Sequence, residues 1–190
     1  MALKHTHTRR SAVGGLLLGI AVLLPQVFHA IPGAGNILLP MHLPVLLCGL
    51  LLGPWYGTAI GAVAPCISHL VSGMPPAARL PFMVLELAVY GLCSGLLARK
   101  LDVSRHKGRI YLCLIGAMLA GRLVYAAALW VAADLLGIPG AGPIAAVTAT
   151  VTGAWGIVIQ LTLLPLTWLA LDKGGLTLGL SGSSPHSAEK

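Results

Sequence analysis

Glu86 and Arg122 are the residues whose types and surroundings most strongly suggest chemistry. Each is an ionisable side chain within a long apolar stretch. An isolated charge in hydrocarbon is costly, so such residues pair with each other or contact a ligand. We therefore expect either a structural ion pair between two helices or a direct contact of at least one of them with a bound molecule, and the sequence leaves both open.

Other polar side chains follow the same apolar stretches. His42 stands out because two prolines bracket it, and the second one frees a backbone carbonyl in the preceding turn. Thr148, Thr152 and Trp155 have the i, i+4, i+7 spacing of one helix face. Each histidine has the alternative of a hydrogen-bonded side chain at a membrane surface. The candidate binding residues are His29, Asn36, His42, His69, Arg79, Glu86, Arg122, Tyr125, Trp130, Thr152 and Trp155.

The elements that must position these side chains are helices in a bilayer. No Asp, Glu, Lys or Arg occurs between Arg10 and Arg79, and hydrophobic residues make up 57% of the chain. A water-soluble domain could not cover itself with this composition, whereas hydrocarbon favours it. At about 20 apolar residues per span, the sequence predicts an all-α membrane protein with a bundle of six transmembrane helices. We expect the helices at residues 11–28, 37–53, 55–72, 81–98, 110–133 and 145–171.

The distribution of basic residues predicts the orientation of this bundle. Six spans place both termini on one side, and ten of the 12 Lys and Arg residues then share that side. Both termini are therefore expected in the cytoplasm. The net charge of +7 is interpreted as a topology signal and a contact with membrane lipid, with no nucleic-acid partner. We expect a cytoplasmic segment at 1–10, one transmembrane substrate-binding domain at 11–171, and a disordered cytoplasmic tail at 172–190.

With this orientation, the polar residues fall in the outer halves of the spans. The inner halves are almost purely apolar. A channel or proton pump would carry polar residues through the full depth of the membrane. The pattern predicts instead a cavity that is open to the outside and closed beneath by an apolar floor. Such a cavity suits the capture of a scarce solute.

The sequence lacks the motifs of several enzyme classes. It contains no Gly-x-x-x-x-Gly-Lys-Ser/Thr loop for ATP, no His-Glu-x-x-His and no Gly-x-Ser-x-Gly. The four cysteines fall within predicted spans without metal-site spacing, so we expect no metal site and no cofactor. A small intramembrane enzyme that uses Glu86 and His42 remains the main alternative. A membrane scaffold whose polar residues only pack helices is another.

Small residues recur four apart in several predicted helices. Such pairs allow helix backbones to approach closely in lipid, so internal packing is the simplest interpretation. Ala12, Gly15 and Gly19, on the first helix, are the best candidates for a face that docks another membrane protein. The pairs are Gly15/Gly19, Gly49/Gly53, Gly57/Gly61 and Gly91/Gly95.

Three segments of the chain resemble one family of membrane proteins. The segment Leu39-Pro-Met-His-Leu-Pro-Val-Leu-Leu-Cys-Gly-Leu-Leu-Leu-Gly-Pro-Trp-Tyr-Gly57 resembles the second-to-third-span region of the substrate-binding S components of energy-coupling factor (ECF) transporters. Gly73-Met-Pro-Pro76 and Met83-Val-Leu-Glu-Leu-Ala-Val-Tyr-Gly91 are similar to the region that follows. The resemblance covers residues 11–171.

The resemblance implies a division of labour in a bacterial or archaeal plasma membrane. An S component binds a vitamin or related micronutrient and associates with a transmembrane coupling protein and two ATPase subunits, whose ATP hydrolysis drives uptake. The first helix of the family carries an Ala-x-x-x-Ala-type docking motif, and Gly15-Leu-Leu-Leu-Gly19 is its nearest match here. The metal-binding N-terminal Met-His of the cobalt and nickel branch is absent from the start of this chain.

The substrate stays open among several chemical classes. Arg79, Arg122 and the histidines suit a carboxylate or a phosphate. Glu86, Trp130 and Trp155 suit a cationic or aromatic ring. Histidines also leave haem or a corrinoid open, as axial ligands of its metal.

Overall fold

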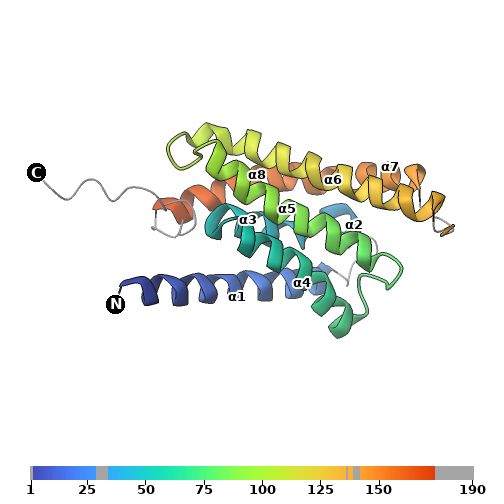
Figure 1. Ribbon diagram of the computed structural model, residues 1–190, viewed down its shortest axis with the longest axis horizontal. Helices are drawn as coiled ribbons and strands as arrows, with labels where there is room; N and C mark the ends of the chain where they lie inside the picture. The colour runs from blue at the N-terminus through green and yellow to red at the C-terminus, as the bar shows by residue number, and fades with distance from the viewer. Residues whose placement is uncertain (1, 29–33, 136, 139–141, 174–190) are drawn as a thin grey trace, which may run out of the picture.

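The computed structural model describes residues 2–28, 34–135, 137–138 and 142–173, and this part of the chain is helical, with no strand. Figure 1 shows the longer helices lying side by side along the long axis of the molecule. In chain order the elements are α1 (Ala2–Phe28), α2 (Ala34–Leu38), α3 (His42–Leu52), α4 (Pro54–Ser72), α5 (Leu80–Lys100), the 3-10 turn η1 (Lys107–Arg109), α6 (Ile110–Asp134), α7 (Pro143–Thr152) and α8 (Ala154–Lys173).

Four of the described segments are long and apolar enough to cross a membrane. They are His7–Phe28, Leu80–Lys100, Lys107–Asp134 and Ala154–Lys173. Large apolar side chains point outward from the bundle, and Leu70 and Ile144 are 83% and 84% exposed. A surface of this kind is stable against lipid and not against water. These observations support a multi-pass membrane protein.

The prediction of a single helix at residues 37–53 is wrong, because the structure has two helices there. α2 ends at Leu38, α3 begins at His42, and Leu39 between them has φ 50°. Leu39 precedes Pro40, and the residue before a proline is disfavoured in the α conformation. Pro44 lies in the first turn of α3, where its missing N–H costs little. The 11 residues of α3 extend about 17 Å, less than the roughly 30 Å of a hydrocarbon core.

The helix expected at residues 145–171 is also interrupted. α7 ends at Thr152 and α8 begins at Ala154, with Gly153 between them. Glycine is a poor helix former, which explains the position of the break. The two helices nevertheless stay nearly continuous, because the Gly153 N–H donates to the Ala149 carbonyl (3.0 Å) and the Ile157 N–H donates to the Gly153 carbonyl (3.1 Å).

The other four expected helices are confirmed to within a few residues, except at the start of the chain. α1 begins at Ala2 and therefore includes most of the segment 1–10 that was expected to precede the first helix. The expected tail from residue 172 lies outside the described residues beyond Lys173.

Glycines bring α3, α4 and α5 into backbone contact. A Cβ added to Gly57 of α4 would overlap the backbone of Gly91 in α5, and a Cβ on Gly91 would overlap Gly57 in return. Gly49, Gly61 and Gly95 are equally tight against a neighbouring backbone. Internal packing is therefore confirmed for these glycines. At Gly53, where α3 turns into α4, φ is 97°, a conformation that side-chain-bearing residues rarely adopt.

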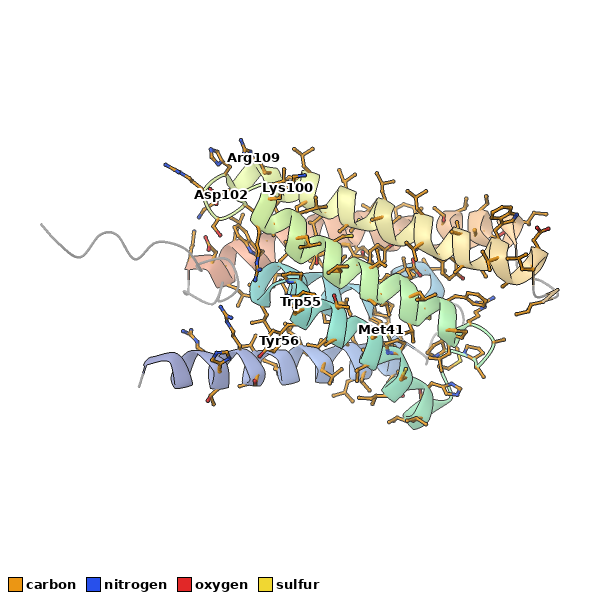
Figure 2. The ribbon with its side chains drawn as sticks, in the orientation of Figure 1. Met41, Trp55, Tyr56, Lys100, Asp102 and Arg109 are labelled. Atoms are coloured by element: carbon orange, nitrogen blue, oxygen red, sulfur yellow. The ribbon has the colours of Figure 1, made fainter. Side chains whose placement is uncertain are left out.

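The two ends of the bundle differ in chemistry. The start of α1, the α5–α6 connection and the end of α8 lie at one end, and the α4–α5 connection lies at the other (Figure 1). Figure 2 shows Lys100, Asp102 and Arg109 at the first of these ends, whereas Met41 lies farther along the bundle. Basic side chains thus gather at the end where α1 begins.

Candidate functional site

A cavity of about 550 Å³ lies toward the end of the bundle that holds the α4–α5 connection. This volume is in the range of pockets that bind small molecules, roughly 300–1,000 Å³. Its lining comes from helices α1 to α7 and from the α2–α3 and α4–α5 connections, so it is enclosed by most of the bundle. The exposed Arg79 and the buried Glu86 both line it, which means that the cavity extends from the surface into the interior.

Glu86 and Arg122 form an ion pair in the deep part of this cavity. The Oε1 atom of Glu86 on α5 lies 3.1 Å from Nη1 of Arg122 on α6. The Glu86 side chain is 3% exposed and that of Arg122 is 12% exposed. In such a buried setting, removal of one partner leaves an uncompensated charge at a large free-energy cost. The pair therefore links α5 to α6 and also presents its charges to the cavity.

His42 completes this cluster from a third helix. Its Nε2 atom lies 3.8 Å from the same Glu86 oxygen. The ring of Tyr90 packs edge-on against the His42 ring, with centroids 5.1 Å apart at 65°. His42 is the first residue of α3, so the break in the chain before α3 determines where its ring lies. We call Glu86, Arg122 and His42 the polar cluster.

Several polar atoms of this region are buried without a hydrogen-bond partner among the described residues. They include Nε and Nη2 of Arg122, both ring nitrogens of His42, Oγ of Ser68 and the acceptor Oε1 of Glu86. All four residues line the cavity. Unpaired buried donors cost about 1–3 kcal/mol each, so a site of this kind favours an occupant that accepts hydrogen bonds.

Several candidate residues from the sequence come together at the cavity. They are His42, Arg79, Glu86, Arg122, Tyr125 and Thr152, and Thr148 accompanies them. They come from α3, α5, α6, α7 and the end of the α4–α5 loop. A single cavity thus collects polar residues that are up to 110 positions apart, from His42 to Thr152.

Other candidates lie elsewhere. Nδ1 of His69 is 2.7 Å from the carbonyl oxygen of Pro75, so this ring braces the α4–α5 loop and is not part of the cavity lining. Trp130 and Trp155 are 58% and 69% exposed and are also outside the lining. The backbone of Asn36 lies in α2, and His29 lies outside the described residues.

The sequence interpretation missed much of the lining. Ser68 lines the cavity and its neighbour His69 does not, because successive residues of an α-helix point about 100° apart. The apolar lining was also missed, since it resembles ordinary core in the sequence. Only the prolines close to Met41 and Met74 in the sequence could have indicated that these apolar residues line a cavity. The missed residues include Leu39, Met41, Met74, Phe82, Met83 and Leu129.

The three candidate docking residues lie on the outside of α1. Ala12 and Gly15 are exposed and Gly19 is half-buried. A Cβ added to Gly15 or Gly19 would meet no atom within 4 Å, in contrast to the glycines of α4 and α5. Internal packing therefore does not account for this pair.

Comparison with known proteins supplies the family. Neither the curated proteins nor the solved structures contain a match to the chain. A family described as "ECF transporter, substrate-specific component" matches residues 9–168, which span α1 to nearly the end of α8. Since this match covers most of the chain and includes the whole cavity, the protein belongs to the family of ECF transporter substrate-specific components.

Proposed function

We propose that this protein captures a vitamin or related micronutrient outside the cell and presents it for ATP-driven uptake by partner subunits. The family is that of a transporter's binding component, which favours this function over the enzyme and scaffold alternatives. The observation that carries the proposal is the cavity of about 550 Å³ with the polar cluster in its wall. A scaffold needs no such cavity.

The proposed orientation places the cavity on the outer side of a bacterial or archaeal plasma membrane. Support comes from the basic residues, which gather at the end of the bundle remote from the α4–α5 loop. The positive-inside rule then directs this basic end to the cytoplasm. The cavity would face the medium from which the solute is taken.

A reporter that works only in the cytoplasm tests this orientation. Fused after Lys190 or inserted near Arg105, it should be active, because six spans place the C-terminus and the α5–α6 connection on the side that holds most basic residues. Inserted near Gly140, it should be inactive. Activity at Gly140 would reverse the orientation and turn the cavity toward the cytoplasm.

The proposed partners are a transmembrane coupling protein and two ATPase subunits. The chain itself contains no phosphate-binding loop for ATP. The outer face of α1 supports a partner in the membrane, because Ala12 and Gly15 are exposed and a Cβ on Gly15 or Gly19 would meet no atom within 4 Å. Faces of this kind let a second helix approach closely in lipid.

Reconstitution in liposomes tests the division of labour. The purified chain should bind its ligand alone and should accumulate it only when coupling protein, ATPases and ATP are present. The paired replacement Gly15→Leu/Gly19→Leu should reduce uptake to near background and leave ligand affinity unchanged, because it fills only the outer face of α1. The matched control is Leu16→Ala, on the same helix and 65% exposed.

Two results would oppose this proposal in different ways. Concentrative uptake by the chain alone would exclude an ECF mechanism. Loss of ligand binding in the Gly15→Leu/Gly19→Leu protein would place these glycines in the binding fold and not on a partner surface.

A further inference from the structure

We propose that the ligand of the cavity is a monocarboxylic acid with a largely apolar body, whose carboxylate binds the free edge of Arg122. This inference rests on the proposed binding function and specifies the substrate class. The sequence alone left acids, cations and metal-bearing macrocycles open.

The Arg122 guanidinium is paired on one side only. One of its terminal nitrogens, Nη1, is used by Glu86 at 3.1 Å. The other two nitrogens, Nε and Nη2, have no hydrogen-bond partner among the described residues. Nε and Nη2 form one edge of the planar group, and this edge matches the two oxygens of a carboxylate. Glu86 thus contacts Arg122 on one side, and the hydrogen-bonding capacity of the buried bidentate side stays unused.

The cavity wall holds more unpaired hydrogen-bond donors than acceptors. Arg122 can only donate hydrogen bonds, and Ser68 and His42 add further unpaired donor groups to the same wall. Glu86 is the acidic residue of the described lining, and its Oε1 atom, which faces Arg122 and His42, is the one unpaired acceptor that belongs to a carboxylate there. Unpaired donors outnumber it, so a ligand rich in acceptors satisfies more of this wall than a cation does.

The net charge of the cavity lining also favours an acid. The described lining holds two guanidinium groups, Arg79 and Arg122, against the single carboxylate of Glu86. Leaving His42 aside, the lining carries one excess positive charge. A carboxylate with one negative charge balances it, whereas a phosphate monoester carries about −1.5 to −2. The charge balance therefore favours the carboxylate.

The remaining lining defines the body of the ligand. Apart from the polar groups above, Tyr125 and the threonines of α7, the wall is formed by apolar and methionine side chains, which suit an apolar or weakly polar body. They include Leu39, Met41, Met74, Phe82, Met83 and Leu129.

Gly153 leaves space for the guanidinium beside its Nη2 atom. A Cβ at this position would lie 3.0 Å from Nη2 of Arg122 and 2.8 Å from the Leu39 side chain. The break between α7 and α8 thus leaves room for the Arg122 head group beside the cavity. Gly153 is a positioning residue in this arrangement.

The experiment loads the purified full chain from a low-molecular-mass yeast-extract fraction. The fraction is supplemented with matched acid and neutral pairs, namely nicotinate and nicotinamide, pantothenate and panthenol, and lipoate and lipoamide, and with thiamine as a cation. Compounds retained after washing are identified by mass spectrometry. We expect an organic acid, retained at least about tenfold better than its neutral amide or alcohol counterpart, which is the effect of losing a charge-assisted hydrogen bond.

Variants of both charged residues examine the role of each charge. Arg122→Gln should abolish retention of the acid, and Arg122→Lys should restore it only in part, since lysine keeps the charge without the planar fork. Glu86→Gln should lower retention less than Arg122→Gln does, because Glu86 positions the guanidinium and does not itself bind the carboxylate. Full binding in Arg122→Gln, or a loss in folded Glu86→Gln protein as complete as in Arg122→Gln, would overturn the proposal.

The unmodified chain by itself still tests the substrate class if a variant fails to fold. Retention of thiamine, or of a neutral compound in preference to every acid, would refute the substrate class and leave the binding function intact. Retention of a phosphate ester in place of a carboxylate would refute the proposal that the acidic group of the ligand is a carboxylate. Retention of no compound at all would refute the proposed binding function, and the inference with it.

Discussion

Replacement of Gly91 by leucine should prevent the bundle from assembling. A Cβ on Gly91 would overlap the backbone of Gly57, and neither backbone can move without separating α4 from α5. Overpacking in a core typically costs about 1–3 kcal/mol, and an overlap with backbone lies at or above the upper end of that range. We expect little monodisperse protein in detergent and a melting temperature far below that of the unmodified chain.

The matched control is the same replacement at Gly15. No atom lies within 4 Å of a Cβ at that position, so Gly15→Leu should leave the melting temperature nearly unchanged. Equal stability of the two variants would mean that α4 and α5 are not in backbone contact.

Replacement of Glu86 by leucine should have the second largest effect, because it leaves the Arg122 charge buried without its partner. Breaking a buried pair in this way costs about 3–5 kcal/mol. The double variant Glu86→Leu/Arg122→Leu should recover much of this loss, since exchange of both partners for apolar residues is often neutral. The free energy of coupling from the double-mutant cycle measures the pair directly.

The exposed pair between Lys107 and Asp172 provides the control for this measurement. Its charged atoms are 3.4 Å apart, but the Lys107 side chain is 50% exposed. Lys107→Ala should therefore change stability by no more than about 1 kcal/mol. A coupling at Glu86 and Arg122 no greater than this would contradict the buried ion pair.

The sequence predicted the all-α membrane class of the fold well, because lipid imposes a strong and local constraint. A chain without charge between Arg10 and Arg79 has few alternatives to membrane helices. A Glu86–Arg122 pair was one of two alternatives that this constraint left open, and the structure shows the contact. His42, which was singled out for its flanking prolines, lies beside that pair.

The sequence could not predict where helices break or which way their faces turn. The split between α2 and α3 depends on the proline that follows Leu39, and the α7–α8 break depends on Gly153, yet prolines and glycines elsewhere in the chain stay inside helices. Ser68 lines the cavity, whereas its neighbour His69 does not, because consecutive residues of a helix point in different directions. Likewise, Gly15/Gly19 in α1 and Gly91/Gly95 in α5 have the same spacing. Only the structure shows that the α1 pair faces outward and the α5 pair packs against a neighbouring helix.

The central claim is that the cavity beside the polar cluster holds the small molecule. Ala149 lines this cavity, whereas Val151, two residues on in α7, is 69% exposed on the outside. The decisive measurement is the amount of small molecule retained by purified Ala149→Trp and Val151→Trp proteins of equal melting temperature. The account predicts that Ala149→Trp retains much less, because the indole occupies part of the cavity, and that Val151→Trp retains as much as the unmodified chain. Full retention by Ala149→Trp would contradict it and place the binding site elsewhere in the molecule.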